Sequence, residues 1–110
     1  MDIAGMMGKV KELQEKMQQA QEDIQYLTAT GEAGGGLVRA TANGQRKVLK
    51  IEIDESLFKP EDREMLADLM VAAVNKALDE AGELGRQELQ RRTSGLMPNI
   101  PGLDLGSFGG

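Results

Sequence analysis

Apolar residues near the start of the chain follow a helical period. From about Ala4 to Thr28 they recur at alternating steps of four and three positions, which is the stripe of an amphipathic helix. The stripe consists of Met6, Val10, Leu13, Met17, Ala20, Ile24 and Leu27. It predicts a long N-terminal helix with its methionines in a core; a flexible binding groove is the alternative use of such residues.

The stretch from Leu37 to Asp54 instead reads as two extended runs joined at Asn43-Gly44. An Asn-Gly pair between strand-like runs favours a hairpin with a two-residue type I′ turn. The register expected from such a turn pairs Ala42 with Gln45, Ala40 with Lys47, and Val38 with Leu49. Side chains then alternate between faces, and the apolar set expected to face the helices is Val38, Leu49, Ile51 and Ile53.

The same hairpin carries a basic cluster, which consists of Arg39, Arg46, Lys47 and Lys50. No acidic residue occurs from Ala33 to Ile51. Two interpretations stay open. The cluster is either a solvated outer face that protects the sheet against aggregation, or a surface that contacts phosphates.

The segment before the hairpin is rich in glycine. Tyr26 to Thr30 has strand-like content, and Gly31 with the run 34–36 permits a tight reversal. This predicts a first strand that joins the hairpin in a three-stranded antiparallel sheet. A phosphate-binding loop is disfavoured, because no Gly-Lys-Ser/Thr follows and the segment leads into a strand.

A second helical period runs from about Pro60 to Thr93. Its stripe contains Leu66, Leu69, Met70, Ala73, Val74, Ala77, Leu78, Ala81 and Leu84. The small residues at 72, 73, 77 and 81 allow another backbone to approach closely, and Gly82 and Gly85 predict a bend or a close contact. Three arginines lie near the helix end, where they either stabilise the dipole or reach phosphates.

The predicted fold is therefore α+β: a long N-terminal helix, a three-stranded antiparallel sheet and a long C-terminal helix. Residues 1–94 form one domain, and residues 95–110, rich in Gly and Pro, form a flexible tail. The 110-residue chain has only 3% aromatic residues and a modest core, so a homodimer is expected.

Composition limits the chemistry. The chain has no cysteine and no histidine, which excludes disulfides, thiolate nucleophiles and histidine bases or ligands. The acidic group Asp54, Glu55, Glu61 and Asp62 is interpreted as helix-start electrostatics rather than a metal site. No apolar run approaches the roughly 20 residues that a membrane span needs, and no signal peptide is recognised. We expect a cytoplasmic protein without membrane contact, cofactor, metal or small-molecule substrate.

The net charge of −5 argues against coating DNA by bulk charge, but it leaves room for local basic patches. An enzyme is disfavoured, because no nucleophile–base constellation is recognisable without His or Cys. Two classes remain: a DNA-binding architectural protein, and a cytoplasmic protein-interaction adaptor that does not bind DNA.

Three segments carry a family resemblance: KVKELQEKMQQAQEDI, TGEAGGGLVRATANGQRKVLKIEID and MLADLMVAAVNKAL. In this order they resemble the YbaB/EbfC family of bacterial nucleoid-associated proteins. Glu55 is a departure, because relatives commonly have Pro there. The resemblance implies a homodimer with protruding helical arms that binds double-stranded DNA, changes its conformation and associates with the nucleoid, with an influence on gene expression.

The resemblance supplies no residue motif for DNA contact, so candidate residues are chosen by charge and position. The first helix offers Lys9, Lys11 and Lys16; the hairpin offers Arg39, Arg46, Lys47 and Lys50; the last helix offers Arg86, Arg91 and Arg92. These side chains predict phosphate contacts with little base readout, because the chain has almost no aromatic residues to stack on bases.

Overall fold

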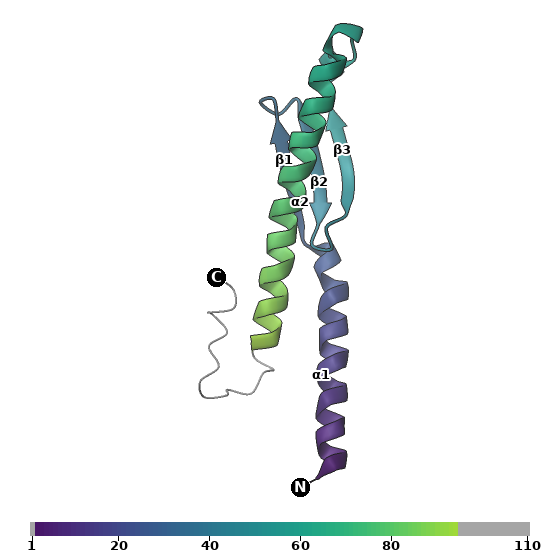
Figure 1. Ribbon diagram of the computed structural model, residues 1–110, viewed down its shortest axis with the longest axis vertical. Helices are drawn as coiled ribbons and strands as arrows, with labels where there is room; N and C mark the ends of the chain where they lie inside the picture. The colour runs from purple at the N-terminus through teal and green to yellow at the C-terminus, as the bar shows by residue number, and fades with distance from the viewer. Residues whose placement is uncertain (1, 95–110) are drawn as a thin grey trace.

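The computed structural model describes residues 2–94 and has the predicted order of elements (Figure 1). Helix α1 spans Ile3–Asp23, and helix α2 spans Arg63–Ser94. Between them lie β1 (Thr28–Ala33), β2 (Val38–Asn43) and β3 (Val48–Ile53), which form one antiparallel sheet in the order β1-β2-β3. The predicted α+β class is confirmed. The predicted tail, 95–110, lies outside the described residues.

Helix α1 ends earlier than predicted, at Asp23 rather than Thr28. It passes into a single 3-10 turn, Ile24–Tyr26, and then into β1. The Gly44 N–H of the hairpin turn donates to the carbonyl groups of Ile24 (3.0 Å) and Leu27 (2.8 Å). These carbonyl groups therefore bond to the hairpin instead of continuing the helix. The tip of the hairpin is thereby fastened to the end of the first helix.

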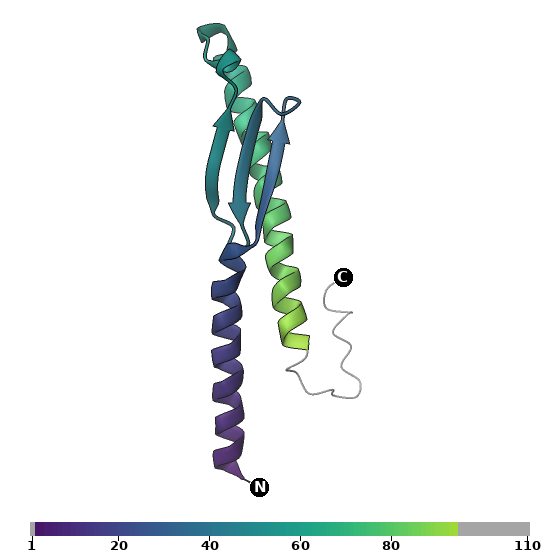
Figure 2. The same cartoon turned by 180° about the vertical axis from the view of Figure 1, so that it is seen from behind.

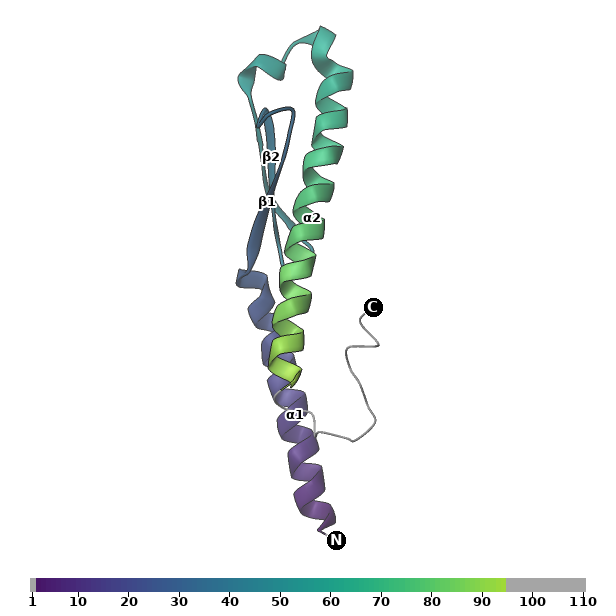
Figure 3. The same ribbon diagram turned by 90° about the vertical axis from the view of Figure 1, so that its left-hand side faces the viewer.

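The core lies between α2 and the sheet, as two layers (Figure 3). Ala73, Ala77 and Ala81 of α2 are fully buried, so the predicted close approach of another backbone is confirmed, with the sheet as the partner. Gly31 belongs to this contact. A Cβ there would lie 2.4 Å from the Ala73 carbonyl oxygen, which explains why a glycine sits inside β1.

The expectation that Gly31 takes part in the reversal is therefore wrong. Gly31 is paired with Ala40 inside the sheet. The reversal between β1 and β2 uses Gly34, Gly35 and Gly36, which all have positive φ. Glycine adopts this left-handed region without steric cost.

The hairpin turn is one residue longer than predicted. The Asn43 N–H donates to the Lys47 carbonyl at 2.9 Å, and the loop between them is residues 44–46. The Asn43 carboxamide oxygen accepts the N–H groups of Gln45 (3.0 Å) and Lys47 (3.2 Å), which stabilises this wider turn. Positive φ falls on Arg46, at 62°, not on both central residues of a two-residue turn.

The predicted register of β2 on β3 is consequently wrong. Ala42 pairs with Val48, and an irregularity between Thr41 and Ala42 shifts the rest, so that Val38 pairs with Ile53 rather than with Leu49. An extra residue at a β-bulge changes the pairing of every residue beyond it.

Strand β3 is largely uncovered, because α2 packs on β1 and β2 and barely contacts β3 (Figure 2). Val38 is buried as predicted, and Ile53 is partly buried. Leu49 and Ile51, which were expected in the core, are 55% and 37% exposed. An apolar edge strand remains on the surface of the single chain.

The molecule is elongated, with extents of 72 × 26 × 15 Å and a radius of gyration of 20.2 Å. A compact domain of this length has about 13 Å. Helix α1 continues well past the end of α2 (Figure 1). Its stripe is buried only near the sheet, at Ala20, whereas Met6, Met7 and Val10 are more than half exposed. The predicted methionine core does not hold for this projecting part.

Candidate nucleic-acid interface

The candidate basic residues do not form one continuous patch. They occupy three places: the projecting part of α1, the hairpin, and the last three turns of α2. Attraction for a phosphate depends on whether each cation already has a carboxylate partner, because a paired carboxylate cancels the charge and repels the phosphate. The ion pairs therefore separate the candidates.

The three candidate arginines near the end of α2 are all paired. Arg86 makes a bidentate contact with Glu83, at 2.9 and 2.6 Å. Glu88 accepts from both Arg91 and Arg92, and these hydrogen bonds, the Arg91 bond first, lower the pKa of Glu88 from 4.5 to about 2. Each of the three arginines therefore has a carboxylate partner that competes with a phosphate.

Arg92 also connects the two helices. Its Nη1 donates to Asp23 Oδ2 at 2.7 Å, and this bond is the main cause of the lowered pKa of Asp23. Asp23 is the last residue of α1, so Arg92 fixes the end of α2 against the base of the projecting arm.

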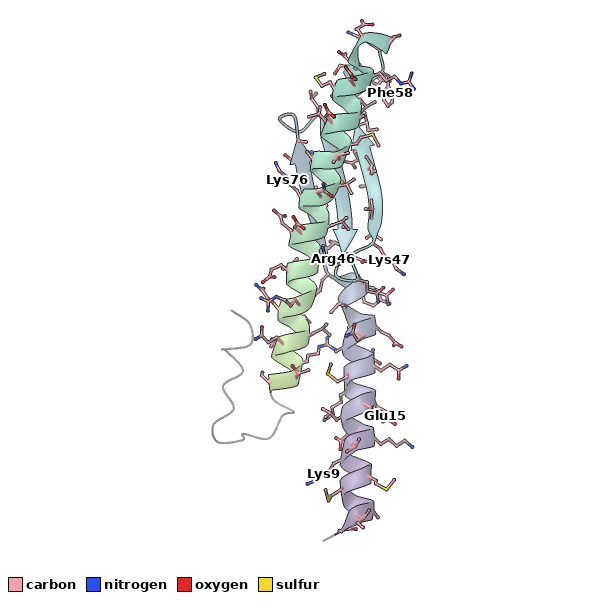
Figure 4. All side chains as sticks on the ribbon, in the orientation of Figure 1. Lys9, Glu15, Arg46, Lys47, Phe58 and Lys76 are labelled. Carbon is pink, nitrogen blue, oxygen red and sulfur yellow. The ribbon has the colours of Figure 1, made fainter. Side chains whose placement is uncertain are left out.

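The hairpin cluster divides between different sides. On the outer face of the sheet, Arg39 pairs with Glu32 (3.0 Å) and Lys50 pairs with Glu52 (2.8 Å), which lowers the pKa of Glu52. Arg46 lies instead toward α2, near Asp79, and Lys47 points away on the other side (Figure 4). The predicted single basic surface on the hairpin is not formed.

The projecting part of α1 is different. Lys16 pairs with Glu12 at 3.0 Å, one helical turn away. Lys9 and Lys11, like Lys47 of the hairpin, make no ion pair with any residue from 2 to 94, and all three are exposed. Lys9 lies near the free end of the arm (Figure 4).

A groove of about 520 Å³ opens where α1, the hairpin tip and α2 meet. Polar side chains around it include Gln18, Gln21, Gln45, Arg46 and Arg86. Its floor consists of glycines from two elements. A Cβ on Gly85 would lie 2.6 Å from the Gly44 carbonyl oxygen, so the hairpin tip touches the α2 backbone directly.

The acidic group after β3 has a local structural role. Asp54 Oδ1 accepts the Ser56 N–H at 2.9 Å and caps the 3-10 turn Glu55–Leu57, which lowers the pKa of Asp54. Within residues 2–94, no group of three or more acidic side chains is arranged to hold a metal ion. None of the helices described is long and apolar enough to cross a membrane.

Sequence reasoning missed the carboxylates that neutralise the arginines. The spacing of Glu83 to Arg86, and of Glu88 to Arg91 and Arg92, is three or four residues. This spacing is a readable signal for pairs on one helix. The bond from Arg92 to Asp23 spans 69 residues and has no local signal.

The arrangement defines a class: an elongated helix–sheet–helix protein with a projecting arm and an apolar edge strand. The family model of the YbaB/EbfC DNA-binding family matches residues 1–96, so the chain belongs to this family. Because that family is one of DNA-binding proteins, the prediction of a non-enzymatic protein is confirmed.

Relatives cover almost the whole chain. A nucleoid-associated protein of Agrobacterium fabrum is 46% identical over 94% of this chain and 96% of its own length. One of Bartonella bacilliformis is 45% identical over 94% and 95%. The crystal structure of an uncharacterized protein of Helicobacter pylori is similar with a TM-score of 0.69 and 26% identity, covering 84% of this chain and 97% of that one.

Proposed function

We propose that the protein binds double-stranded DNA as a homodimer, mainly through phosphates, and changes how the DNA is organised. It associates with the nucleoid in the cytoplasm and thereby influences gene expression. Membership of a DNA-binding family carries the proposal, together with relatives named as nucleoid-associated proteins. The exposed arm of α1, with two cations that have no carboxylate partner among residues 2–94, supplies a contact surface.

The arm lysines are the best phosphate contacts. Lys9 and Lys11 both belong to the part of α1 that projects beyond α2, and Lys9 lies near its free end (Figure 4). A dimer has two such arms and four such lysines. Each phosphate neutralised on duplex DNA contributes about −0.9 to the slope of log K against log salt. Together these lysines contribute about −3.6 to that slope.

The test is fluorescence anisotropy with a labelled random duplex, titrated at low and near-physiological salt. The double variant Lys9→Gln/Lys11→Gln is expected to lose about tenfold or more in affinity and most of this slope. Arg39→Gln/Lys50→Gln is the control that removes the same number of charges. Both cations are exposed but paired, with Glu32 and Glu52, so their loss is expected to change little. Absence of binding at low salt by the folded wild type would refute the proposal and favour the adaptor.

The apolar face of β3 is the proposed dimer surface. Val48, Leu49 and Ile51 are 40%, 55% and 37% exposed, and Phe58 beyond the strand is 64% exposed. An uncovered apolar edge strand pairs readily with another chain. A second copy fits best, because a chain of this size buries too little of its own surface to leave this face open.

Sedimentation velocity tests this surface. Ile51→Glu is expected to give monomers at concentrations where the wild type is a dimer. Ile3→Glu is the control: Ile3 is 69% exposed at the start of α1, so the same change there removes apolar surface from the arm only. Dissociation by the Ile3 variant, with a dimer retained by the Ile51 variant, would move the interface to the arms.

A further inference from the structure

Arg46 occupies a backbone conformation that normally selects glycine. Its φ is 62°, and within residues 2–94 it is the only non-glycine residue with positive φ. It ends the three-residue loop of the hairpin, where glycine is preferred because it has no Cβ. An arginine at this position is strained, and such strain is characteristic of functional sites.

A second observation falls on the same side chain. Gly82 lies inside α2, where glycine weakens the helix. The three heavy atoms that would lie nearest to a Cβ on Gly82 all belong to the Arg46 side chain, with Cγ, Cζ and Nη1 at 3.4 Å. Gly85 differs, because the atoms nearest to its Cβ would be backbone atoms of Gly44. The effect of Gly82 is to let the Arg46 guanidinium lie across α2.

The guanidinium is weakly engaged where it lies. Its nearest carboxylate, Asp79, is 3.9 Å away, beyond hydrogen-bond distance, and both side chains are mostly exposed. The neighbouring Glu83 is already occupied by Arg86 and Gln87. Arg46 thus keeps its N–H donors for an anion that accepts two bonds through a pair of oxygens, as a carboxylate or a phosphate does.

We propose that Arg46 binds a phosphodiester of the DNA backbone at the head of the groove between α1 and α2. This inference rests on the proposed function. The groove is open, and it lies between the base of the arm and α2 (Figure 4). Gln18 and Gln21 line it and provide neutral donors beside the cation, while Glu22 places one carboxylate on the same lining and Arg86 a second cation. Glycine would adopt this backbone conformation without strain, but it has no positive charge with which to bind the phosphodiester.

The experiment compares Arg46→Gly with Lys76→Gln in the full-length protein. Each variant loses one positive charge, but Lys76 lies on α2 away from the groove, where its Nζ donates to the Glu32 carbonyl (Figure 4). Thermal unfolding measures the strain, and anisotropy against salt with a random duplex measures the contact. Arg46→Gly is expected to unfold at the same or a higher temperature. In a dimer it is expected to lose about 1.8 from the salt slope and several-fold in affinity.

Lys76→Gln is expected to keep the wild-type slope, and Arg46→Lys to keep part of the affinity. Wild-type affinity and slope in Arg46→Gly would overturn the inference while leaving the proposed function standing. An equal loss in Lys76→Gln would overturn the groove as the site. A lower unfolding temperature for Arg46→Gly would overturn the idea that the backbone at Arg46 is strained. A folded wild type that does not bind at low salt would instead refute the proposed function itself.

Discussion

Arg92 and Asp23 form the ion pair that joins the two long helices. The Arg92 Nη1 lies 2.7 Å from Asp23 Oδ2, and both side chains are about one-third exposed. The same guanidinium donates through Nε to Glu88 Oε1 at 2.8 Å, within α2. One planar cation thus connects two carboxylates from different helices, a use that favours arginine over lysine.

Replacing Arg92 should loosen the end of α2 from α1. In Arg92→Gln we expect a small decrease in unfolding temperature and faster hydrogen exchange in the last turns of α2, because α1 and α2 share few other contacts. Arg91→Gln is the control, since Arg91 pairs only within α2. Equal exchange in the two variants would show that the Asp23 contact does not hold the helices together.

Acidification should weaken the same contact. The pKa of Glu88 is lowered from 4.5 to about 2 by Arg91 and Arg92, and the pKa of Asp23 is lowered chiefly by Arg92. Groups with a lowered folded-state pKa stabilise the fold above their ordinary pKa, and lose this contribution as pH falls through the folded value. The difference in unfolding temperature between wild type and Arg92→Gln should therefore be constant from pH 7 to about 5 and shrink toward pH 2. A difference that grows below pH 4 would contradict this assignment.

Gly31→Ala should be strongly destabilising. Its Cβ would lie 2.4 Å from the Ala73 carbonyl oxygen and 2.5 Å from the Ala77 nitrogen, so the sheet and α2 must separate. Overpacking of this kind costs about 1–3 kcal/mol or more. Gly8→Ala is the matched control: nothing lies within 4 Å of its Cβ, and alanine favours the helix by up to about 1 kcal/mol. Denaturant unfolding should give opposite signs for the two variants.

Asn43→Ala should destabilise the hairpin turn. The Asn43 side chain is 5% exposed and accepts two backbone N–H groups, from Gln45 and Lys47. Its loss leaves these donors without their acceptor, at about 1–3 kcal/mol. The control is Asn75→Ala on the exposed face of α2, which should be neutral or slightly stabilising. Similar unfolding free energies for both variants would contradict the importance of the turn.

Local patterns were sufficient to predict the elements, because helix and strand periods and glycine positions are properties of neighbouring residues. The hairpin register was not predictable in this way. It depends on Asn43 accepting two N–H groups and on Arg46 adopting positive φ, in place of the two-residue turn that Asn-Gly suggests. The exposure of Ile51 could not be predicted from the sequence either, because it depends on which strands α2 covers.

The candidate site was predicted as a set of cations, without their partners. Pairs such as Glu83–Arg86 follow from helical spacing, whereas Arg92–Asp23 requires the tertiary fold. The position of Arg46 over Gly82 is also tertiary. Charge along the sequence therefore indicated where basic residues gather, but not which of them retain an effective charge.

The contact between Gly44 and Gly85 limits how closely the hairpin tip, and the end of α1 that is fastened to it, can approach α2. Main chain meets main chain there, so the separation of α1 from α2 at their junction is already the minimum that atoms permit. Substitutions of side chains farther along α1 and α2 can change the charge of these helices without altering their separation at the junction. The surface charge and the spacing of the two helices can therefore vary independently.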